Sequence, residues 1–314
     1  MQGQHKVLVI MTGGTIAQTA ASDGKMQITR SAEDLVAQTG LDNVDTFTVG
    51  ARIGANLTMD TAHAIAAKIM ENEASYDGFV LIGGTDSMEE LAYLLDLVIA
   101  IDAPVVLTGS MKPGDVLGYD GIANLQQAIM IASSPASRGR GVLVAMNDQV
   151  HVARYVRKAD TQLIGAFQSH PGPVGEIRRG QLFFYYDNTR STESFDWRVL
   201  PHTPRDVRVI FFCFDQPFSK HLFADADGAV IAGMGSASLS DEWIEALSPE
   251  WTGKMPIAVV SRAMKGANFN DSYYRGSLQK YEDRGFLLTD YVHLNPMQAR
   301  IKLALSLAKA KHPG

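Results

Sequence analysis

The sequence predicts an α/β protein, with a larger N-terminal domain built on a mainly parallel sheet flanked by helices and a smaller C-terminal α/β domain. Three observations lead to this prediction. Short apolar runs alternate with segments of helical periodicity, as in parallel sheets covered by helices. The 314 residues, 46% of them hydrophobic, are enough for about two domains. A polar stretch that begins at residue 187 indicates an interdomain linker.

Four near-continuous apolar runs predict strands in the first domain. Each run is short and is bounded by Gly, Asn, Asp, Pro or a polar turn, as expected for strands buried on both faces. The runs are Val7–Met11, Phe79–Ile82, Val105–Leu107 and Val142–Met146.

Helical periodicity appears between these runs. Apolar residues recur at spacings of three and four, which places them on one face of a helix. The three sets are Met59, Ala62, Ile65, Ala66, Ile69 and Met70, then Leu91, Leu94, Leu95 and Val98, then Leu125, Ala128, Ile129 and Ala132.

The domain boundaries follow from the polar stretch. We place the N-terminal domain at residues 1–187, the linker at 188–206 and the C-terminal domain at 207–314. The same pattern of strand and helix then resumes in the second domain. Its predicted elements are the strands at Val207–Phe214, Val230-Ile231 and Ile257–Val260, a helix near Asp241–Leu247, and a last helix that begins near Asn295-Pro296 and runs through Leu307.

Charge and hydropathy exclude several classes of partner. The net charge of −6 and the lack of clustered Lys and Arg argue against nucleic acid. No apolar stretch approaches the roughly 20 residues of a membrane span, and the first apolar run is too short for a signal peptide. We therefore expect a cytoplasmic protein. Cys213, the one cysteine, lies in an apolar run, so we expect a buried thiol rather than a disulfide or a nucleophile.

Two Gly-Gly-Thr turns follow predicted strands, at residues 13–15 and 83–85. Alone, either one would be interpreted as a tight turn with threonine as a helix cap. Their occurrence as a pair, with Asp86 next in the chain, favours a site instead. Glycine permits close backbone approach and frees N–H groups for a ligand, and sites in open α/β sheets form at the carboxyl ends of strands.

Other kinds of site are poorly supported by the sequence. No Gly-x-Gly-x-x-Gly follows the first strand, and no phosphate-binding loop is present. The eight histidines are scattered, without His-x-x-x-His or Cys-x-x-Cys spacing, so we predict no metal site. His151, near Asp148 in a predicted loop, is interpreted as a surface or structural histidine.

These segments resemble the motifs of the bacterial L-asparaginases, in the asparaginase/glutaminase family, over nearly the whole chain. The first turn resembles the family's nucleophile motif. Further similar segments are Gly84 to Glu90, Thr108 to Pro113 with Asp120-Gly121 and Asn124-Leu125, Met146 to Asp148 with Arg154 and Lys158, and Leu294-Asn295-Pro296 with Ala299-Arg300. The resemblance implies a hydrolase that converts L-asparagine to L-aspartate and ammonia, with weaker action on glutamine and without metal or cofactor.

The resemblance also implies residue roles. Thr15 is the primary nucleophile and forms a β-aspartyl ester, while Thr85, Asp86 and Lys158 make the second catalytic group. Lys158 acts as a base only when neutral, which burial or a neighbouring cation favours, and its alternative interpretation is a surface lysine. The Asp86 carboxylate binds the substrate's α-ammonium. Further implied substrate-binding residues are Gly14, Ala55, Asn56, Gly84, Ser110 and Ser238.

Two departures from the family pattern and one further match affect these expectations. Ala55 stands where a serine is usual, while Asn56 retains a group for the α-carboxylate. No tyrosine occurs between Gln18 and Arg30, a segment interpreted either as a catalytic lid or as a flexible loop. Ser238 matches a segment that, in the family, reaches a neighbouring subunit's site, which implies a homodimer or homotetramer.

Two other functions are weighed against the asparaginase. An amidase or amidotransferase-type subunit would usually carry an extra N-terminal domain, whereas the first strand here begins at Val7. A non-catalytic amino-acid-binding protein with the same fold would explain Ala55 and the missing tyrosine. The joint presence of both threonines, Asp86 and Lys158 argues against it.

Overall fold

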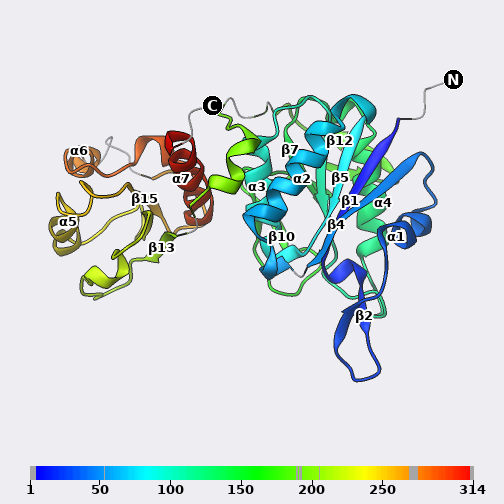
Figure 1. Cartoon of the computed structure of the whole chain (residues 1–314), viewed down its shortest axis with the longest axis horizontal. Helices are drawn as coiled ribbons and strands as arrows, with labels where there is room; N and C mark the ends of the chain where they lie inside the picture. Colours follow the sequence, from blue (N-terminus) through cyan, green and yellow to red (C-terminus); the bar gives the residue numbers. More distant parts are fainter. Residues whose placement is uncertain are drawn as a thin grey trace. The chain divides into compact units, whose positions relative to one another are not determined.

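The computed structural model describes residues 5–52, 54–188, 190, 193–204, 206–268 and 275–311. The chain divides into two compact units, Met1–Pro201 and His202–Gly314 (Figure 1). This division falls within the predicted linker, where Trp197–His202 forms a 3-10 helix that buries Val199 and Leu200. Residues 189, 191, 192 and 205 of that linker lie outside the described residues.

Unit 1 contains an eight-stranded sheet in the order β12-β11-β8-β7-β6-β5-β1-β4. The five strands from β7 to β4 run parallel, and the other three pair antiparallel. All four predicted strands are confirmed as β1, β5, β6 and β7. The strands are β1 (Val7–Gly13), β4 (Val44–Arg52), β5 (Gly78–Ile82), β6 (Val105–Thr108), β7 (Val142–Met146), β8 (Gln149–Val152), β11 (Gly175–Arg178) and β12 (Gln181–Phe184).

Four helices cover the two faces of this sheet. Helices α1 (Ala32–Thr39) and α4 (Gly121–Ala132) pack against each other and on one face. Helices α2 (Met59–Glu71) and α3 (Met88–Val98) lie on the other face (Figure 1). The three helices predicted from periodicity are therefore confirmed, as is the mainly parallel α/β fold.

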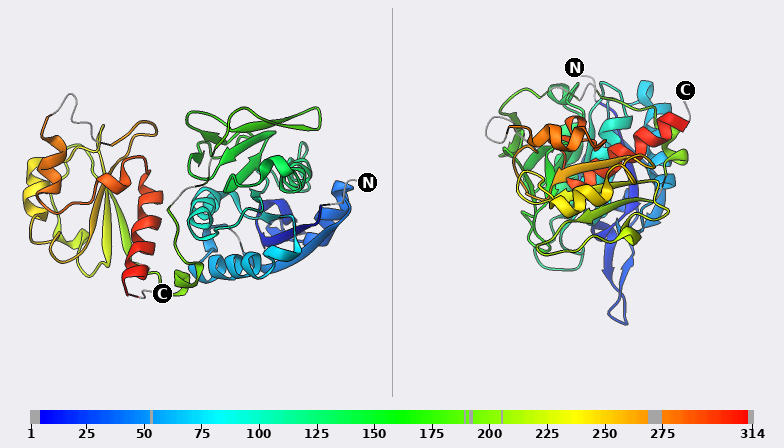
Figure 2. Two further views of the ribbon diagram at one scale, coloured as in Figure 1. Left: turned by 90° about the horizontal axis from the view of Figure 1, so that it is seen from above. Right: turned by 90° about the vertical axis from the view of Figure 1, so that its left-hand side faces the viewer.

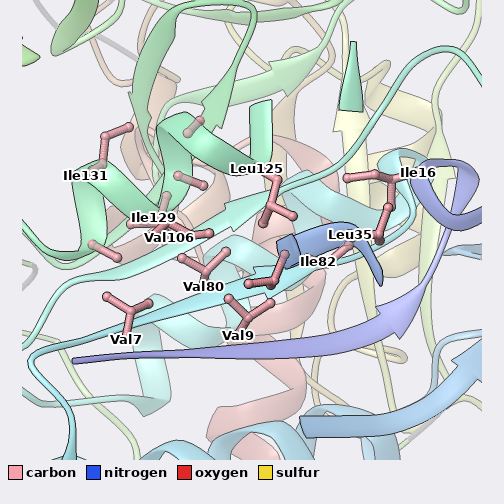
Figure 3. Packing of buried hydrophobic residues seen from close by; sticks show 14 of the residues in the cluster. Val7, Val9, Ile16, Leu35, Val80, Ile82, Val106, Leu125, Ile129 and Ile131 are labelled. Carbon is pink, nitrogen blue, oxygen red and sulfur yellow. The ribbon is translucent and has the colours of Figure 1, made fainter. Parts of the chain in front are cut away.

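The core between the sheet and helices α1 and α4 explains why the central strands are continuous apolar runs in the sequence. Successive residues of a strand face opposite sides, so β1 directs Val7 and Val9 to this face. They pack with Val80 from β5 and with Leu35 and Leu125 from the two helices (Figure 3). Because the alternate residues of β1 are buried as well, the strand has no polar face.

Two short hairpin pairs complete unit 1. Strands β2 (Gln18–Ala20) and β3 (Met26–Ile28) pair antiparallel within the segment predicted to be a lid or loop. This hairpin projects from the rest of unit 1, as the blue segment in Figure 1 and in the right view of Figure 2 shows. Strands β9 (Val156–Lys158) and β10 (Phe167–Ser169) form the second pair.

Unit 2 is a smaller α/β unit with a parallel sheet in the order β13-β14-β15. All of its predicted elements are present, although the first strand is shorter than expected. The predicted elements are β13 (Val207–Phe211), β14 (Gly228–Gly233), β15 (Ile257–Ser261), α5 (Asp241–Leu247) and α7 (Pro296–Lys311), and the structure adds α6 (Ser277–Glu282). Asn295 accepts a hydrogen bond from the Gln298 N–H at the start of α7, with Pro296 as the first helical residue, as predicted.

One expectation for unit 2 is wrong. Cys213 is exposed rather than buried, because β13 ends at Phe211 and the apolar run continues past it into a turn. The Cys213 N–H donates to the Gln216 side chain in that turn. Among the described helices of both units, none is long and apolar enough to cross a bilayer.

Candidate active site

The loops that leave β1 and β5 diverge at the carboxyl edge of the unit 1 sheet. These two strands are neighbours and run parallel, with Met11 beside Ile82 in register. After β1 the chain leads to α1 on one face, and after β5 it leads to α3 on the other. Such a divergence between adjacent parallel strands leaves a crevice in which α/β proteins bind ligands.

The two Gly-Gly-Thr turns touch each other through backbone alone. A β-carbon on Gly14 would lie 2.6 Å from the Gly84 nitrogen and 2.7 Å from the Gly83 carbonyl oxygen. Gly14 also has a φ of +92°, a conformation that L side chains rarely adopt. Both properties require glycine, so the sequence of the turn is what allows the two turns to pack together.

Thr15 begins a 3-10 turn, Thr15–Ala17, directly after this contact. Its side chain is half-buried, whereas Ile16 and Ala17 are fully buried in the core below. The Ala17 N–H donates to the Gly14 carbonyl at 3.2 Å, and the Gln18 N–H donates to the Thr15 carbonyl. Thr15 thus lies at the carboxyl edge of the sheet, on a turn anchored from beneath.

Thr85, Asp86 and Lys158 form one cluster beside the second turn. The Lys158 Nζ lies 3.0 Å from the Thr85 hydroxyl oxygen and 2.7 Å from an Asp86 carboxylate oxygen. Thr85 is buried and the Lys158 side chain is only 15% exposed, while the Asp86 side chain is 65% exposed. Lys158 is therefore not the ordinary surface lysine of the alternative interpretation, and Asp86 has a carboxylate open to a ligand.

Glu89 holds the backbone of Lys158 and was not predicted from the sequence. Its carboxylate accepts a hydrogen bond of 2.5 Å from the Lys158 N–H, which ties β9 to α3. Burial raises the pKa of the Glu89 carboxyl, while this N–H and the nearby Arg157 charge act in the opposite direction. The contact spans 69 positions of sequence, so no local pattern could reveal it.

Ser110 lies next to the cluster, but its hydroxyl is engaged within its own loop. Ser110 is buried, and its hydroxyl donates to the Asp120 carboxylate at 2.7 Å. Asp120 also accepts hydrogen bonds from the Met111 and Lys112 N–H groups and from the Asn124 side chain. Gly109 before it packs on the second turn, where a β-carbon would lie 2.7 Å from the Gly83 carbonyl oxygen.

A third loop reaches the same edge from β4. Gly54 lies against Gly84, and its carbonyl accepts a hydrogen bond of 3.0 Å from the Ser87 hydroxyl. Ala55 and Asn56 follow in the 3-10 turn Gly54–Asn56, and both are exposed. Ile53, before them, lies outside the described residues. The predicted positions 54–56 are thereby brought to the Gly84 turn.

Ser238 belongs to unit 2 and is exposed. It follows Ala237, which has a φ of +74°, in a turn closed by hydrogen bonds in both directions between Met234 and Ser238. Its expected role is a contact to a neighbouring subunit, and that role stays a prediction.

His151 is structural and buried rather than at the surface. It lies in strand β8, not in a loop, and its Nδ1 lies 2.8 Å from the Ser169 hydroxyl oxygen. Burial lowers the pKa of His151 to about 4. No group of three or more His, Cys, Asp or Glu side chains is arranged to hold a metal ion within the described part of the chain.

Family models cover nearly all of the chain. The model described as "Asparaginase, N-terminal" matches residues 6–190. The model described as "Glutaminase/Asparaginase C-terminal domain" matches residues 209–314. The two matches together span both structural units.

Individual proteins are similar over most of their lengths. L-asparaginase 2 of Escherichia coli (strain K12) is 33% identical over 98% of this chain and 90% of that protein. Glutaminase-asparaginase of Pseudomonas fluorescens biotype A is 28% identical over 97% of this chain and 87% of that protein. The crystal structure of a probable cytoplasmic L-asparaginase from Campylobacter jejuni superposes with a TM-score of 0.84 at 28% identity, covering 98% and 96% of the two chains.

Proposed function

Because this chain belongs to the asparaginase family, we propose that it hydrolyses L-asparagine to L-aspartate and ammonia with Thr15 as the nucleophile. The observation that carries the proposal is the packing of Gly14 on Gly84. It joins the turn before the half-buried Thr15 to the turn before Thr85, whose hydroxyl is hydrogen-bonded to Lys158. A hydroxyl nucleophile needs such neighbouring groups, since it is weak until its proton is removed.

The first half of the reaction is acyl transfer. The Thr15 oxygen bonds to the side-chain carbonyl carbon of asparagine, and the bond from that carbon to nitrogen breaks. The nitrogen leaves as ammonia and carries away the hydroxyl proton of Thr15. Backbone N–H groups of the glycine turns are suitable donors to the oxyanion formed during this step. The product is a β-aspartyl ester on Thr15.

The second half is hydrolysis of that ester. A water oxygen bonds to the same carbon, the ester bond to Thr15 breaks, and a proton returns to the threonine. We assign proton transfer in this chemistry to Thr85 and Lys158, whose oxygen and nitrogen lie 3.0 Å apart. Lys158 accepts a proton only in its neutral form. Neither half of the reaction changes an oxidation state, so the reaction requires no redox cofactor.

Substrate selection follows from the exposed carboxylate of Asp86. It is paired with the Lys158 nitrogen on one side and open on the other. A charge-assisted hydrogen bond to an α-ammonium group would select an amino acid over a simple amide. Asn56 is assigned to the substrate's α-carboxylate. Ser110 is assigned a supporting role, because its hydroxyl is bonded to Asp120.

Glutamine is proposed as a weaker substrate. It is longer than asparagine by one methylene, which changes binding in a pocket by about 1–3 kcal/mol. One similar protein is named a glutaminase-asparaginase, so both amides are reasonable candidates. Comparing the kcat/KM values for the two amides would rank them.

The location and the assembly of the protein stay predictions. One similar solved protein is named cytoplasmic, whereas a Haemophilus influenzae relative that is 32% identical is named periplasmic. We propose a cytoplasmic homotetramer, or a homodimer, in which Ser238 of one subunit approaches the site of another. Cell fractionation tests the location. Sedimentation of wild type and Ser238→Ala tests the assembly, and the activity of Ser238→Ala tests whether Ser238 contributes to a neighbouring site.

Ammonia release from asparagine and glutamine tests the proposed function directly. Thr15→Ala and Thr85→Ala are each expected to lower kcat by about 10³-fold or more, the scale seen when a catalytic group is removed. Thr48→Ala, on the exposed edge of β4, is the matched control and should keep full activity. A Thr15→Ala variant with normal turnover would show that another group attacks the amide.

A further inference from the structure

The turn that carries Thr15 is held by a tyrosine from a distant segment. The Tyr119 hydroxyl donates a hydrogen bond of 2.7 Å to the Ile16 carbonyl oxygen, across 103 positions of sequence. Ile16 is fully buried and follows Thr15 directly within the 3-10 turn. A bond to this carbonyl therefore acts on the peptide unit beside the nucleophile.

Tyr119 is itself held on two sides. The next residue, Asp120, is buried and accepts hydrogen bonds from Ser110, Met111, Lys112 and Asn124. The Arg30 guanidinium lies over the Tyr119 ring, 5.3 Å from its centroid, and donates to the Gly114 carbonyl at 3.0 Å. The ring is thus placed between a bonded loop and a cation, so its hydroxyl has little freedom to move.

Two further hydrogen bonds connect the same loop to the chain just after the turn. The Gly114 N–H donates to the Gln18 carbonyl at 2.9 Å. The Asp115 carboxylate accepts from the Ala20 N–H at 2.9 Å. Residues 114–119 therefore hold the chain on the C-terminal side of Thr15, and the packing of Gly14 on Gly84 holds its N-terminal side.

The protonation state of the phenol suits this role. Burial raises the pKa of Tyr119 to about 12, although the nearby Arg30 charge acts to lower it. At neutral pH the hydroxyl keeps its proton and remains a donor. Without that donor, the buried Ile16 carbonyl would lose the hydrogen bond that Tyr119 provides.

We propose that Tyr119 is a positioning residue for catalysis, because its bond to the Ile16 carbonyl sets where the Thr15 hydroxyl stands relative to the substrate amide. The inference rests on the proposed role of Thr15 as nucleophile. A displacement of about 1 Å at a reacting group costs about 10²-fold in rate. Loss of the bond should therefore slow turnover and leave substrate binding largely intact.

The test compares Tyr119→Phe with Tyr76→Phe in the full-length protein. Both variants lose a hydrogen bond of 2.7 Å, but the Tyr76 bond to Asp45 lies at the other end of the sheet. We expect Tyr119→Phe to lower kcat by about 10- to 100-fold with KM changed by less than about threefold. Tyr76→Phe should leave both constants at the wild-type values.

Amide hydrogen exchange supplies a readout of the turn itself. The Ala17 and Gln18 N–H groups donate to Gly14 and Thr15 within it. They should exchange faster in Tyr119→Phe, whereas exchange in the distant β6 and β7 strands stays unchanged. Assays are run at a temperature where circular dichroism shows both variants fully folded, so that reduced stability does not mimic reduced turnover.

The outcomes separate this inference from the proposed function. If Thr15→Ala is inactive while Tyr119→Phe has wild-type kcat, the positioning role is wrong and the nucleophile stands. If Thr15→Ala is active, the proposed nucleophile is wrong. Tyr119→Phe could instead show faster exchange throughout unit 1, with a lower kcat and a higher KM. In that case Tyr119 has a merely structural role and the inference is overturned.

Discussion

The Lys158 side-chain nitrogen lies 3.0 Å from the Thr85 hydroxyl oxygen and is shared with the Asp86 carboxylate at 2.7 Å. One amine thus links a buried hydroxyl to an exposed acid. The hydroxyl is suited to proton transfer, and the acid is suited to binding a positively charged substrate group. In the proposed mechanism, proton transfer and substrate selection therefore depend on the same side chain.

Replacing Lys158 should slow turnover strongly, whatever the charge of the new residue. Lys158→Met removes the amine, and Lys158→Arg keeps the positive charge but cannot accept a proton at neutral pH. Both are expected to lower kcat by about 10²–10⁴-fold, the usual contribution of general acid–base catalysis. Steady-state ammonia release is the measurement, and the exposed Lys254→Met is the control. A Lys158→Arg enzyme with near-normal kcat would mean that the charge alone is needed.

Gly14→Ala should cost both stability and activity. The new methyl would overlap the Gly84 backbone at 2.6 Å, and alanine disfavours the φ of +92°. We expect a loss of about 2–4 kcal/mol in the free energy of unfolding, from strain and overpacking together. Denaturant titration and turnover measure the two effects.

Gly180→Ala, in the turn between β11 and β12, is the matched control for that substitution. Gly180 has a φ of +73°, but nothing lies within 4 Å of its would-be β-carbon. It should cost about 1–2 kcal/mol from backbone strain and leave activity nearly unchanged. Equal effects of the two substitutions would show that backbone conformation, and not the contact with Gly84, decides the outcome.

Ala55→Ser should tighten substrate binding. Ala55 is exposed beside Asn56 in a turn that packs on Gly84, so a hydroxyl there could reach a substrate carboxylate. A hydrogen bond of about 1 kcal/mol corresponds to a decrease in KM of about fivefold. Ala55→Val adds bulk without a donor and serves as the comparison. An unchanged KM for asparagine in Ala55→Ser would contradict this role.

His151 should make the protein sensitive to mild acid. Its pKa is about 4 when folded and 6.5 when unfolded, so the unfolded state binds more protons between these values. The stability from the neutral histidine is complete above pH 6.5 and is lost as the pH falls toward 4. At pH 5 the loss is about 2 kcal/mol.

Urea unfolding at pH 5 and pH 7.5 checks this prediction. The His151→Gln variant has no titrating group at this position, so its loss of stability between the two pH values should be smaller by about the same 2 kcal/mol. If wild type and variant show the same pH dependence, His151 does not control it.

The parts of the fold predicted from sequence are those with strong local signals. Strands β1, β5, β6 and β7 are buried on both faces, so they appear as apolar runs. The edge strand β4 (Val44–Arg52) is partly exposed, and polar residues interrupt its apolar ones, so it has no continuous apolar run. The short strands β8, β11 and β12 lack such a run as well.

The parts of the site predicted from sequence are those that carry a motif. Thr15, Thr85, Asp86 and Lys158 lie in recognisable segments, and the structure places the last three within hydrogen-bonding distance. Residues that act through a distant backbone group have no such signal. The Glu89 bond to Lys158 and the Tyr119 bond to Ile16 arise only when the chain folds.

His151 shows a signal that could have been used. Its neighbours Val150 and Val152 alternate with polar residues, a pattern that favours a strand over the predicted loop. In the structure the histidine and Val150 are buried within β8, on opposite faces of the strand.

The backbone contact between Gly14 and Gly84 also limits how this protein can acquire new substrates. Adjacent strands are separated by about 4.8 Å, a distance dictated by peptide hydrogen bonding. With no side chain between the turns, their spacing is set by backbone contact, and any side chain added at Gly14 would overlap the other turn. Adaptation to a longer or shorter amide would therefore have to proceed through the loops at residues 54–56 and 110–120, and libraries directed there should yield altered substrate range most readily.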